Sequence, residues 1–355
     1  MESLSALLGT FAGLFLIAFG IFWVGLQTLP NPFSPPPKDR RQRPQGPGYF
    51  PLPDSLPPAV RRHFEAIFPQ PEEDELDLDD LDEEGFSKLP PGAIVPNLEN
   101  VELRGRGRIR IGPILLPVRF RSEIRLGVRS RRSLEVTWFR TPLLRVVDEI
   151  HLGPRLSAAP PTLHGPNNEL DANPSTDSGA DSGTGAESSL RGRRKVSGWL
   201  KRDVQSEVTD RALGLAGWAE LLAWVPAAVA VPPARWRSVD PALLATFLRG
   251  SAAEQEEAGM DAAVLEVPVG ERSEIFLVHF DHTTGLAHRV RTLKPKGKAG
   301  ELAPWRLDLQ DWKTLRGIQI PSLIYARWED EPGPYAALHL TGRTDHSVAA
   351  SLEAS

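Results

Sequence analysis

The pattern of apolar and polar residues divides the chain into an anchor, two strand-rich regions and a central helix. Residues 4–29 carry no charge, are dominated by Leu, Phe, Ala, Gly and Ile, and end at Pro30. An uncharged run of this length spans about 30 Å of hydrocarbon as a helix. It also lacks the basic start of a cleaved signal peptide. The pattern therefore predicts an uncleaved single-pass anchor over residues 1–30, with the lipid bilayer as its partner through residues 4–29.

Strict alternation of apolar and polar residues begins in the stretch VELRGRGRIRIG. The apolar face of this first strand consists of Val101, Leu103, Ile109 and Ile111. Gly112-Pro113 turns the chain, and further alternating segments follow up to Leu152. Strands joined by short turns predict an antiparallel meander with one buried and one solvated face.

The solvated face of this meander is expected to be rich in arginine. Its predicted members are Arg104, Arg106, Arg108, Arg110, Arg119, Arg121, Arg125, Arg129, Arg131 and Arg132. A wet sheet face needs charge for solubility and to discourage edge pairing. The alternative is a surface for anionic lipid headgroups or phosphate. The first interpretation is favoured.

The segment from Leu213 to Trp236 is a long apolar stretch outside the anchor. Its large residues recur at three- and four-residue steps, which predicts a helix. Pro226 breaks this helix, and Pro232-Pro233 stop it. Because the apolar surface is wider than one stripe, the segment is either core or the wall of a ligand cavity.

Together these elements predict a mainly β (α+β) fold, in which an N-terminal transmembrane helix precedes roughly ten antiparallel strands around one broken apolar helix. The expected segments are the anchor (1–30), a Pro-rich spacer (31–58), a helix and the first meander (59–156), a low-complexity disordered insertion (157–196), the apolar helical region (197–250) and a second meander that completes the same domain (251–347). Within the second meander, FDHTTG at 280–285 predicts a hairpin turn.

Composition narrows the possible functions. The 355 residues carry a net charge of −5, which gives no reason to expect a nucleic-acid partner. The absence of cysteine excludes disulfides, thiol catalysis and Cys-ligated zinc. A basic cluster, Lys38, Arg40, Arg41 and Arg43, follows the anchor and favours a cytoplasmic domain by the positive-inside rule.

Candidate catalytic chemistry is sparse. The sequence holds no GxSxG, HExxH, Walker or GxGxxG motif. His279 and His282 lie close in sequence, but in a strand they point to opposite faces, so neither a metal site nor a cofactor is predicted. Glu220 and Asp148 have apolar neighbours. A buried carboxylate can act as a general acid or base, but pairing with one of the many arginines is the favoured interpretation.

Several motifs, in order, resemble a bacterial family of uncharacterised proteins known as DUF6544. They are LPPAVRRHF, RGRGRIRIGPILLPVRFRSE, EVTWFRTPLLRVVDEI, AELLAWVPAAVAVPPARWRSVD, FDHTTGLAHRV and PWRLDLQDWKTLRGIQIPS. The members of that family look like membrane-tethered β-rich domains. The ending, DW followed by GI and IPS, also resembles lipoprotein carriers of the LolA and LppX type, which are curved antiparallel sheets that wrap helices and hold lipid acyl chains.

The carrier resemblance implies a curved sheet and a set of ligand-binding residues in its concavity. They are Trp138, Trp218, Leu222, Trp224, Pro226 and Trp236. The chain departs from such carriers in its anchor, its insertion and its lack of a lipobox cysteine, which puts free shuttling between membranes in doubt. The resemblance also favours an extracytoplasmic domain, whereas the basic cluster favours a cytoplasmic one. The sequence therefore does not decide on which side of the cell membrane the domain lies.

Three functions follow. The first is non-enzymatic binding of an apolar or lipid ligand between sheet and helix. The second is a structural or protein-interaction module without a ligand cavity, and the third is an enzyme that uses Glu220 or Asp148. An unfilled apolar cavity on the dry side of the sheet would favour the first, and ordinary core packing the second. Polar groups converging on either carboxylate would favour the third.

Overall fold

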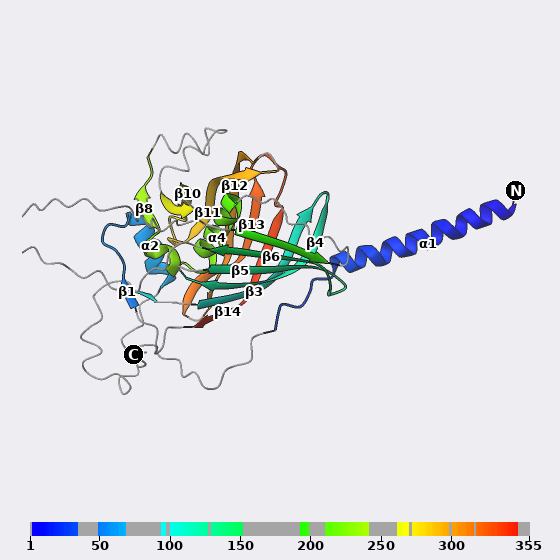
Figure 1. Ribbon diagram of the computed structural model, residues 1–355, viewed down its shortest axis with the longest axis horizontal. Coiled ribbons are helices and arrows are strands. Elements are labelled where there is room, and N and C mark those ends of the chain that lie inside the picture. Colours follow the sequence, from blue (N-terminus) through cyan, green and yellow to red (C-terminus); the bar gives the residue numbers. More distant parts are fainter. Residues whose placement is uncertain are drawn as a thin grey trace, which may run out of the picture.

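The structure, a computed structural model, is built around one large antiparallel sheet that curves around a helix (Figure 1). It describes residues 2–34, 49–68, 94–96, 100–126, 129–151, 192–198, 210–240, 261–269, 272–297, 300–315 and 317–346. The sheet has 12 strands in the order β7-β6-β5-β4-β3-β14-β13-β12-β11-β10-β9-β8. The predicted fold class is confirmed, with two strands more than the roughly ten expected.

The first half of the sheet is the predicted meander. It comprises β3 (Asn100–Ile111), β4 (Ile114–Arg125), β5 (Arg129–Trp138), β6 (Thr141–His151) and β7 (Gly192–Gly198). The second half comprises β8 (Arg235–Ser238), β9 (Ala262–Val269), β10 (Arg272–Phe280), β11 (Ala287–Lys296), β12 (Glu301–Leu315), β13 (Ile318–Trp328) and β14 (Ala336–His346). The last strand, β14, pairs with β3, with Ala336 opposite Ile109, so the two meanders form one continuous sheet. A separate pair consists of β1 (Tyr49–Pro51) and β2 (Ile94–Pro96).

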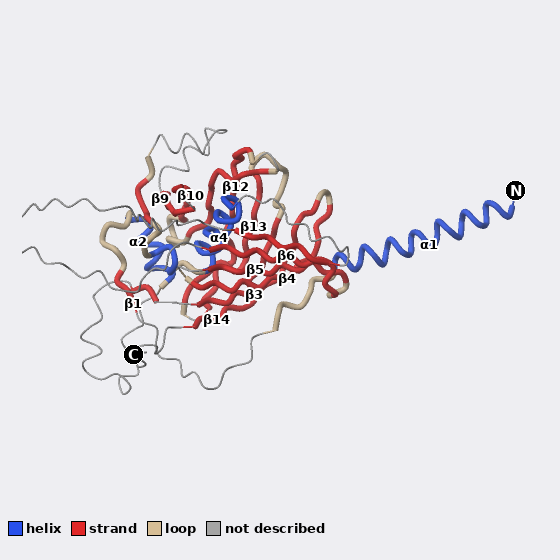
Figure 2. Tube along the Cα trace, in the orientation of Figure 1, coloured by secondary structure: helices blue, strands red, loops and turns tan. Residues whose placement is uncertain are grey.

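The apolar segment forms the helix that the sheet encloses (Figure 2). It consists of α4 (Asp210–Trp224) and a short helix, α5 (Ala227–Ala230), that starts directly after Pro226. The predicted break at this proline is confirmed. Nearly every side chain between Ala212 and Ala230 is buried, because strands from both halves of the sheet contact α4. The helix therefore needs apolar residues all round and not on one stripe.

A second helix, α2 (Pro58–Ile67), covers one end of the core. Pro58 occupies its first position, where the missing N–H is harmless. Its apolar face, with Val60, Phe64 and Phe68, is buried. Trp236 packs edge-on against Phe64, which ties this helix to β8.

The N-terminal helix, α1 (Glu2–Gln27), projects from the opposite end of the domain (Figure 1). By length and composition, its part from Gly9 to Gln27 is sufficient to cross a membrane. Its last turn packs directly on the sheet. There the indole nitrogen of Trp138 donates a hydrogen bond to the Phe22 carbonyl over 3.3 Å.

Two predictions about the first meander need correction. Residues 192–196, assigned to the disordered insertion, form β7, because Val196 and its neighbours pair with β6. Arg132, assigned to the solvated face, lies on the enclosed face, opposite Asp148 of β6. The solvated face does carry paired charges, such as Arg119 with Glu135 at 2.7 Å. Most of the predicted insertion, residues 157–191, lies outside the described residues.

His63 makes the packing of α2 sensitive to acid. Its Nδ1 accepts a hydrogen bond from the Ala287 amide over 3.2 Å. Burial lowers the pKa of His63 to about 3, which outweighs the opposing effect of the Gly285 carbonyl. The unfolded chain binds a proton on this ring below about pH 6.5 and the folded chain does not. The contribution of His63 to the free energy of unfolding is therefore fully present above about pH 6.5 and is lost as the pH falls toward 3.

We expect His63→Asn to flatten this pH dependence, because the amide oxygen of asparagine can accept the Ala287 bond without titrating. Urea unfolding between pH 7 and pH 5 measures it. The parent chain, measured over the same pH range, supplies the reference slope. An unchanged slope in His63→Asn would show that another group is responsible.

Candidate ligand-binding cavity

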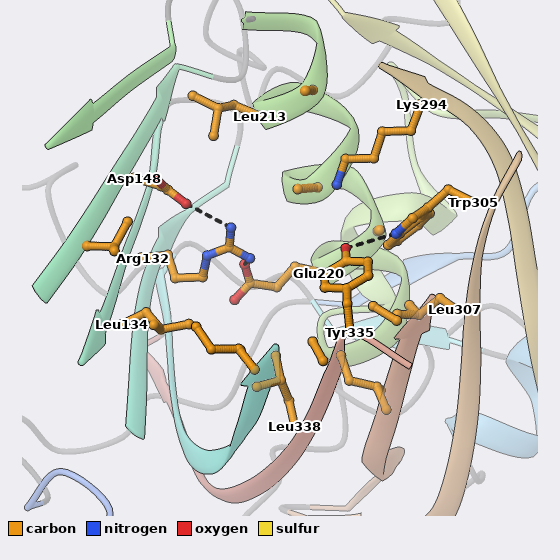
Figure 3. A pocket seen from close by; sticks show the side chains of 18 of the residues that line it. Arg132, Leu134, Asp148, Leu213, Glu220, Lys294, Trp305, Leu307, Tyr335 and Leu338 are labelled. Carbon is orange, nitrogen blue, oxygen red and sulfur yellow. Dashed lines mark hydrogen bonds and ion pairs between the residues drawn. The ribbon is translucent and has the colours of Figure 1, made fainter. Parts of the chain in front are cut away.

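A cavity of about 830 Å³ lies between α4 and the concave face of the sheet (Figure 3). Binding pockets for small molecules typically measure about 300–1,000 Å³. The cavity forms because the two halves of the sheet meet α4 from different sides without closing on each other. The described core is thus not packed throughout to ordinary density, which is the feature expected of a ligand-binding domain.

Most of the cavity wall is apolar. Its large apolar side chains are Ile109, Phe120, Leu134, Val146, Leu213, Trp224, Trp305, Leu307, Ile324, Trp328 and Leu338. They come from α4 and from both halves of the sheet, so residues more than 200 positions apart share one wall. Trp224 stacks on Phe120 with ring centroids 5.2 Å apart, and together they form a flat aromatic patch.

A cluster of charges occupies one side of this cavity. The strand register places Arg132 of β5 opposite Asp148 of β6, and Asp148 opposite Arg194 of β7. Arg132 donates to Asp148 over 2.9 Å, and Arg194 donates to both carboxylate oxygens over 2.6 and 2.8 Å. Asp148 is thus held between two arginines on neighbouring strands.

Two further groups reach this cluster from other elements (Figure 3). Glu220 projects from α4, and its Oε2 lies 3.8 Å from Nη1 of Arg132. Across the cavity, Lys294 of β11 places its ammonium 4.7 Å from the ring centre of Trp305. The Trp305 indole donates to the Tyr335 hydroxyl over 2.9 Å. We call Arg132, Arg194 and Lys294 the cationic cluster.

Burial and neighbouring charge set the protonation of these groups. Burial would raise the pKa of Asp148, but hydrogen bonds from Arg194 and the charge of Arg132 outweigh it and lower that pKa. For Glu220, burial prevails over Arg132 and raises the pKa. Burial, with the charges of Arg132 and Arg194, lowers the pKa of Lys294 to about 7.

The result is an excess of positive charge inside an apolar enclosure. Four cationic residues, Arg110, Arg132, Arg194 and Lys294, and two carboxylates line the cavity, and Glu220 is the easier carboxylate to protonate. A buried charge is costly unless an opposite charge lies close to it. An anionic group in the cavity would restore the balance. The arrangement therefore suits a ligand with an apolar body and one anionic end.

The structure separates the six residues expected to bind a ligand. Trp224 lines this cavity. Trp218 and Trp236 lie outside its lining, and their indoles donate to the carbonyls of Pro268 and Val229, over 2.9 and 2.7 Å. Trp138 lies at the base of α1, while Leu222 and Pro226 are buried in the core away from the lining. These five residues therefore do not line the cavity.

The carboxylates singled out from the sequence, Asp148 and Glu220, do lie in the cavity, and both are associated with arginine as expected. Arg132, Arg194, Lys294 and Tyr335 were not predicted as site residues. A usable signal existed in the two-residue period, because Val146, Asp148 and Ile150 share one strand face. Within the described residues, no group of three His, Cys, Asp or Glu side chains could hold a metal ion.

Comparison with known proteins agrees with the sequence motifs. Residues 195–340 match DUF6544, a family of unknown function. This match confirms the resemblance noted from the sequence. It covers α4 and most of the second half of the sheet, including Lys294, Trp305 and Tyr335. No curated protein matches the chain.

Three solved structures are similar to this chain at low identity. A LolA superfamily protein from Nitrosomonas europaea is 9% identical, with 82% of this chain and 93% of that chain covered and a TM-score of 0.35. A DUF1329 family protein from Desulfovibrio piger is 10% identical, with 73% and 88% covered and a TM-score of 0.34. A putative outer membrane lipoprotein-sorting protein domain from Vibrio parahaemolyticus is 9% identical, with 71% and 87% covered and a TM-score of 0.34.

Arg132 links β5 to α4 through Glu220, and its removal should destabilise the domain. We expect Arg132→Met to lower the free energy of unfolding by on the order of 3 kcal/mol, because Glu220 and Asp148 both lose a buried partner. Its neighbour Arg131 is exposed and supplies a matched control. Arg131→Met should change the free energy by about 0.5 kcal/mol or less.

Denaturant unfolding of both variants measures this difference. Adding Glu220→Gln to Arg132→Met should recover part of the loss, because the uncompensated buried carboxylate is removed. Equal effects of Arg131→Met and Arg132→Met would contradict the enclosed position of Arg132.

Proposed function

We propose that this protein is a membrane-anchored, non-enzymatic domain that binds one amphiphilic lipid between the curved sheet and α4. The observation that supports this most directly is the 830 Å³ cavity, whose wall is mostly apolar and where Lys294 lies across from Arg132 and Arg194. A cavity with a single small polar region orients an elongated ligand, because one end is attracted and the rest is not.

The apolar wall would hold the hydrocarbon part of the ligand. Burial of apolar surface contributes about 25 cal/mol per Å², so an acyl chain that leaves water for this wall gains affinity in proportion to its length. Leu134, Trp328 and Leu338, which are only half-buried, offer accessible apolar wall surface. The volume is that of a pocket for one small molecule, which favours a single-chain lipid.

The cationic cluster would bind the headgroup. Arginine recognises carboxylate and phosphate through paired N–H donors. Arg132 and Arg194 are already oriented by Asp148, so little side-chain entropy is lost when an anion arrives. We therefore expect a carboxylate or phosphate headgroup, with Lys294 on its far side.

The anchor would place this site at a cell membrane. The hydrogen bond from Trp138 to Phe22 and the contact of Arg108 with Gln27 join the last turn of α1 to the sheet. A helix that packs on the mature domain suits a retained anchor better than a segment that is removed.

The deciding experiment is native mass spectrometry with lipid extraction on the full chain purified in a mild detergent. The expected result is one co-purifying lipid with a single anionic headgroup at one copy per chain. A clean apo mass, with no uptake of a fluorescent fatty acid, would favour the structural or protein-interaction module instead.

Narrowing the cavity should weaken binding without unfolding the domain. Leu338 lines the cavity, whereas its neighbour Ala337 points to the other face of β14. We expect Leu338→Trp to reduce fluorescent fatty-acid binding severalfold, because the indole takes up space that the acyl chain needs. Ala337→Trp is the control for an added indole. If both variants bind like the parent, the ligand does not occupy this cavity.

Headgroup binding should depend on pH through Lys294. Its pKa of about 7 in the free protein means that it carries charge below this pH and loses it above. Affinity for an anion should therefore fall as the pH rises through 7. A fluorescent alkyl sulfonate is a suitable probe, because its own head stays anionic throughout.

Titrations of this probe between roughly pH 6 and pH 8.5 would show the fall in affinity, because this range brackets the pKa of Lys294. Lys294→Met should remove the pH dependence and weaken binding at pH 6. Lys313 is exposed on β12, and Lys313→Met should leave both unchanged. A pH dependence that persists in Lys294→Met would assign it to another group.

The same cluster favours an enzyme as the second candidate. Glu220, whose pKa is raised by burial, and Lys294, whose pKa is lowered to about 7, line the same cavity and are the groups that proton transfer would use. Incubation of the purified chain with the recovered lipid tests this. Chemical change that Glu220→Gln or Lys294→Met abolishes would establish catalysis, and an unaltered lipid would support binding alone.

A further inference from the structure

Exposed apolar side chains gather on two adjacent hairpin tips. At the turn between β3 and β4, Ile111, Ile114 and Leu115 are 46%, 40% and 42% exposed. At the turn between β5 and β6, Phe139 is 41% exposed. Large apolar side chains on such turns are unfavourable in water, where polar residues would serve equally well.

These tips account for most of the exposed apolar surface of the described domain outside α1. Outside α1, six large apolar side chains of the described residues are exposed. Four lie on the tips, and the other two are Leu29 and Leu302. Leu29 follows directly after α1 and belongs to the same region, whereas Leu302 starts β12. Five of the six therefore surround the base of α1. We call Leu29, Ile111, Ile114, Leu115 and Phe139 the apolar rim.

The last turn of α1 is fixed among these tips (Figure 1). Arg108, near the tip of β3, donates to the Gln27 side chain over 2.9 Å and to its carbonyl over 3.2 Å. Gly25 lies against Trp138, and a Cβ atom at Gly25 would sit 2.1 Å from the indole nitrogen. The close approach therefore requires glycine, and it holds the helix at a defined place on the domain.

The length of α1 indicates what covers the apolar rim. The 19 residues from Gly9 to Gln27 measure roughly 28 Å as a helix, which matches the hydrocarbon thickness of a bilayer. A span that ends at Gln27 puts the membrane surface at the level of both tips. Trp138 and the exposed Arg140 are residue types typical of the interface, where indoles and guanidinium groups meet headgroups.

We propose that the apolar rim is a second membrane-contact surface, which inserts into the headgroup layer beside α1 and holds the domain against the bilayer. A single helix fixes only one point of the domain. Two flanking hairpin tips would also fix its orientation, with the tip-side end of the sheet facing the lipid. This inference does not depend on whether the cavity holds a ligand.

If the cavity does bind a lipid, as proposed above, the same surface gives its source. Ile109 and Arg110 line the cavity and directly precede Ile111 of the apolar rim. The tip of β3 therefore connects the cavity wall to the membrane surface. A lipid could enter at this end without crossing bulk water.

The lack of native cysteine makes a direct test possible. Leu115→Cys places a single thiol on the apolar rim, and Thr283→Cys places one on the exposed turn at the opposite end of the sheet. Each full-length variant, labelled with the fluorophore NBD, is reconstituted in phosphatidylcholine vesicles. A second set of vesicles carries a nitroxide on the lipid headgroup. Both sites are exposed, so circular dichroism should match the parent.

We expect the probe at position 115 to show a blue-shifted emission and a loss of intensity in nitroxide vesicles. The probe at position 283 should show neither. Equal, unquenched emission at the two positions would overturn the proposal. Disulfide cross-linking between two copies at position 115 without quenching would also overturn it, because the rim would then be a contact between copies.

A further comparison separates this inference from the proposed function. Leu338→Trp, which narrows the cavity, should leave the quenching at position 115 unchanged. If lipid uptake fails while quenching persists, the membrane surface stands and the cavity proposal falls. Quenching that disappears with Leu338→Trp would show that the probe had entered the cavity, and the surface proposal would fall.

Discussion

Burial of one apolar helix inside a single curved sheet is the constraint on which the rest of the structure depends. Apart from Asp210, Arg211 and Glu220, the side chains all around α4 are apolar or glycine, so strands must cover it from several directions. The sheet does so only because β14 pairs with β3 and joins its two halves. Arg343 of β14 also donates to the Trp224 carbonyl over 3.0 Å and satisfies the C-terminal end of the helix.

The cavity is a consequence of that geometry. A helix is a narrow cylinder, and a 12-stranded sheet that curves around it encloses more volume than the helix fills. Large residues such as Phe120 and Trp224 fill one part of this space. The remaining part stays open, and its charged side is held by ion pairs that the strand register dictates. Paired charges on neighbouring strands are a rigid way to present arginine to a ligand.

Anchor, hairpin tips and cavity lie at the same end of the sheet. The base of α1 contacts Arg108 and Trp138, and the cavity lining begins with Ile109 and Arg110. A binding site for a lipid is most effective where the path from the bilayer is short, because an acyl chain in water is strongly disfavoured. The position of the anchor on the domain thus has a physical meaning for the proposed function.

The sequence by itself determined the long apolar N-terminal helix, the β class, the break at Pro226 and the hairpin at 280–285. Each of these follows from local patterns: the length of an apolar run, a two-residue period, or a residue with restricted backbone angles. In the hairpin, for example, Gly285 takes the positive φ of 73° expected of a glycine at a turn.

Only the tertiary structure decided which residues form the site. In RSRRS, Arg131 and Arg132 alternate across the strand, and Arg132 shares the face of Leu134. Only the pairing with Asp148 shows that a charged side chain is accommodated on that inner face. Tryptophan was the natural candidate for a ligand wall, yet Trp218 and Trp236 find carbonyl partners elsewhere. A cavity depends on how distant strands pack around one helix, and that packing is not encoded in any single stretch of the chain.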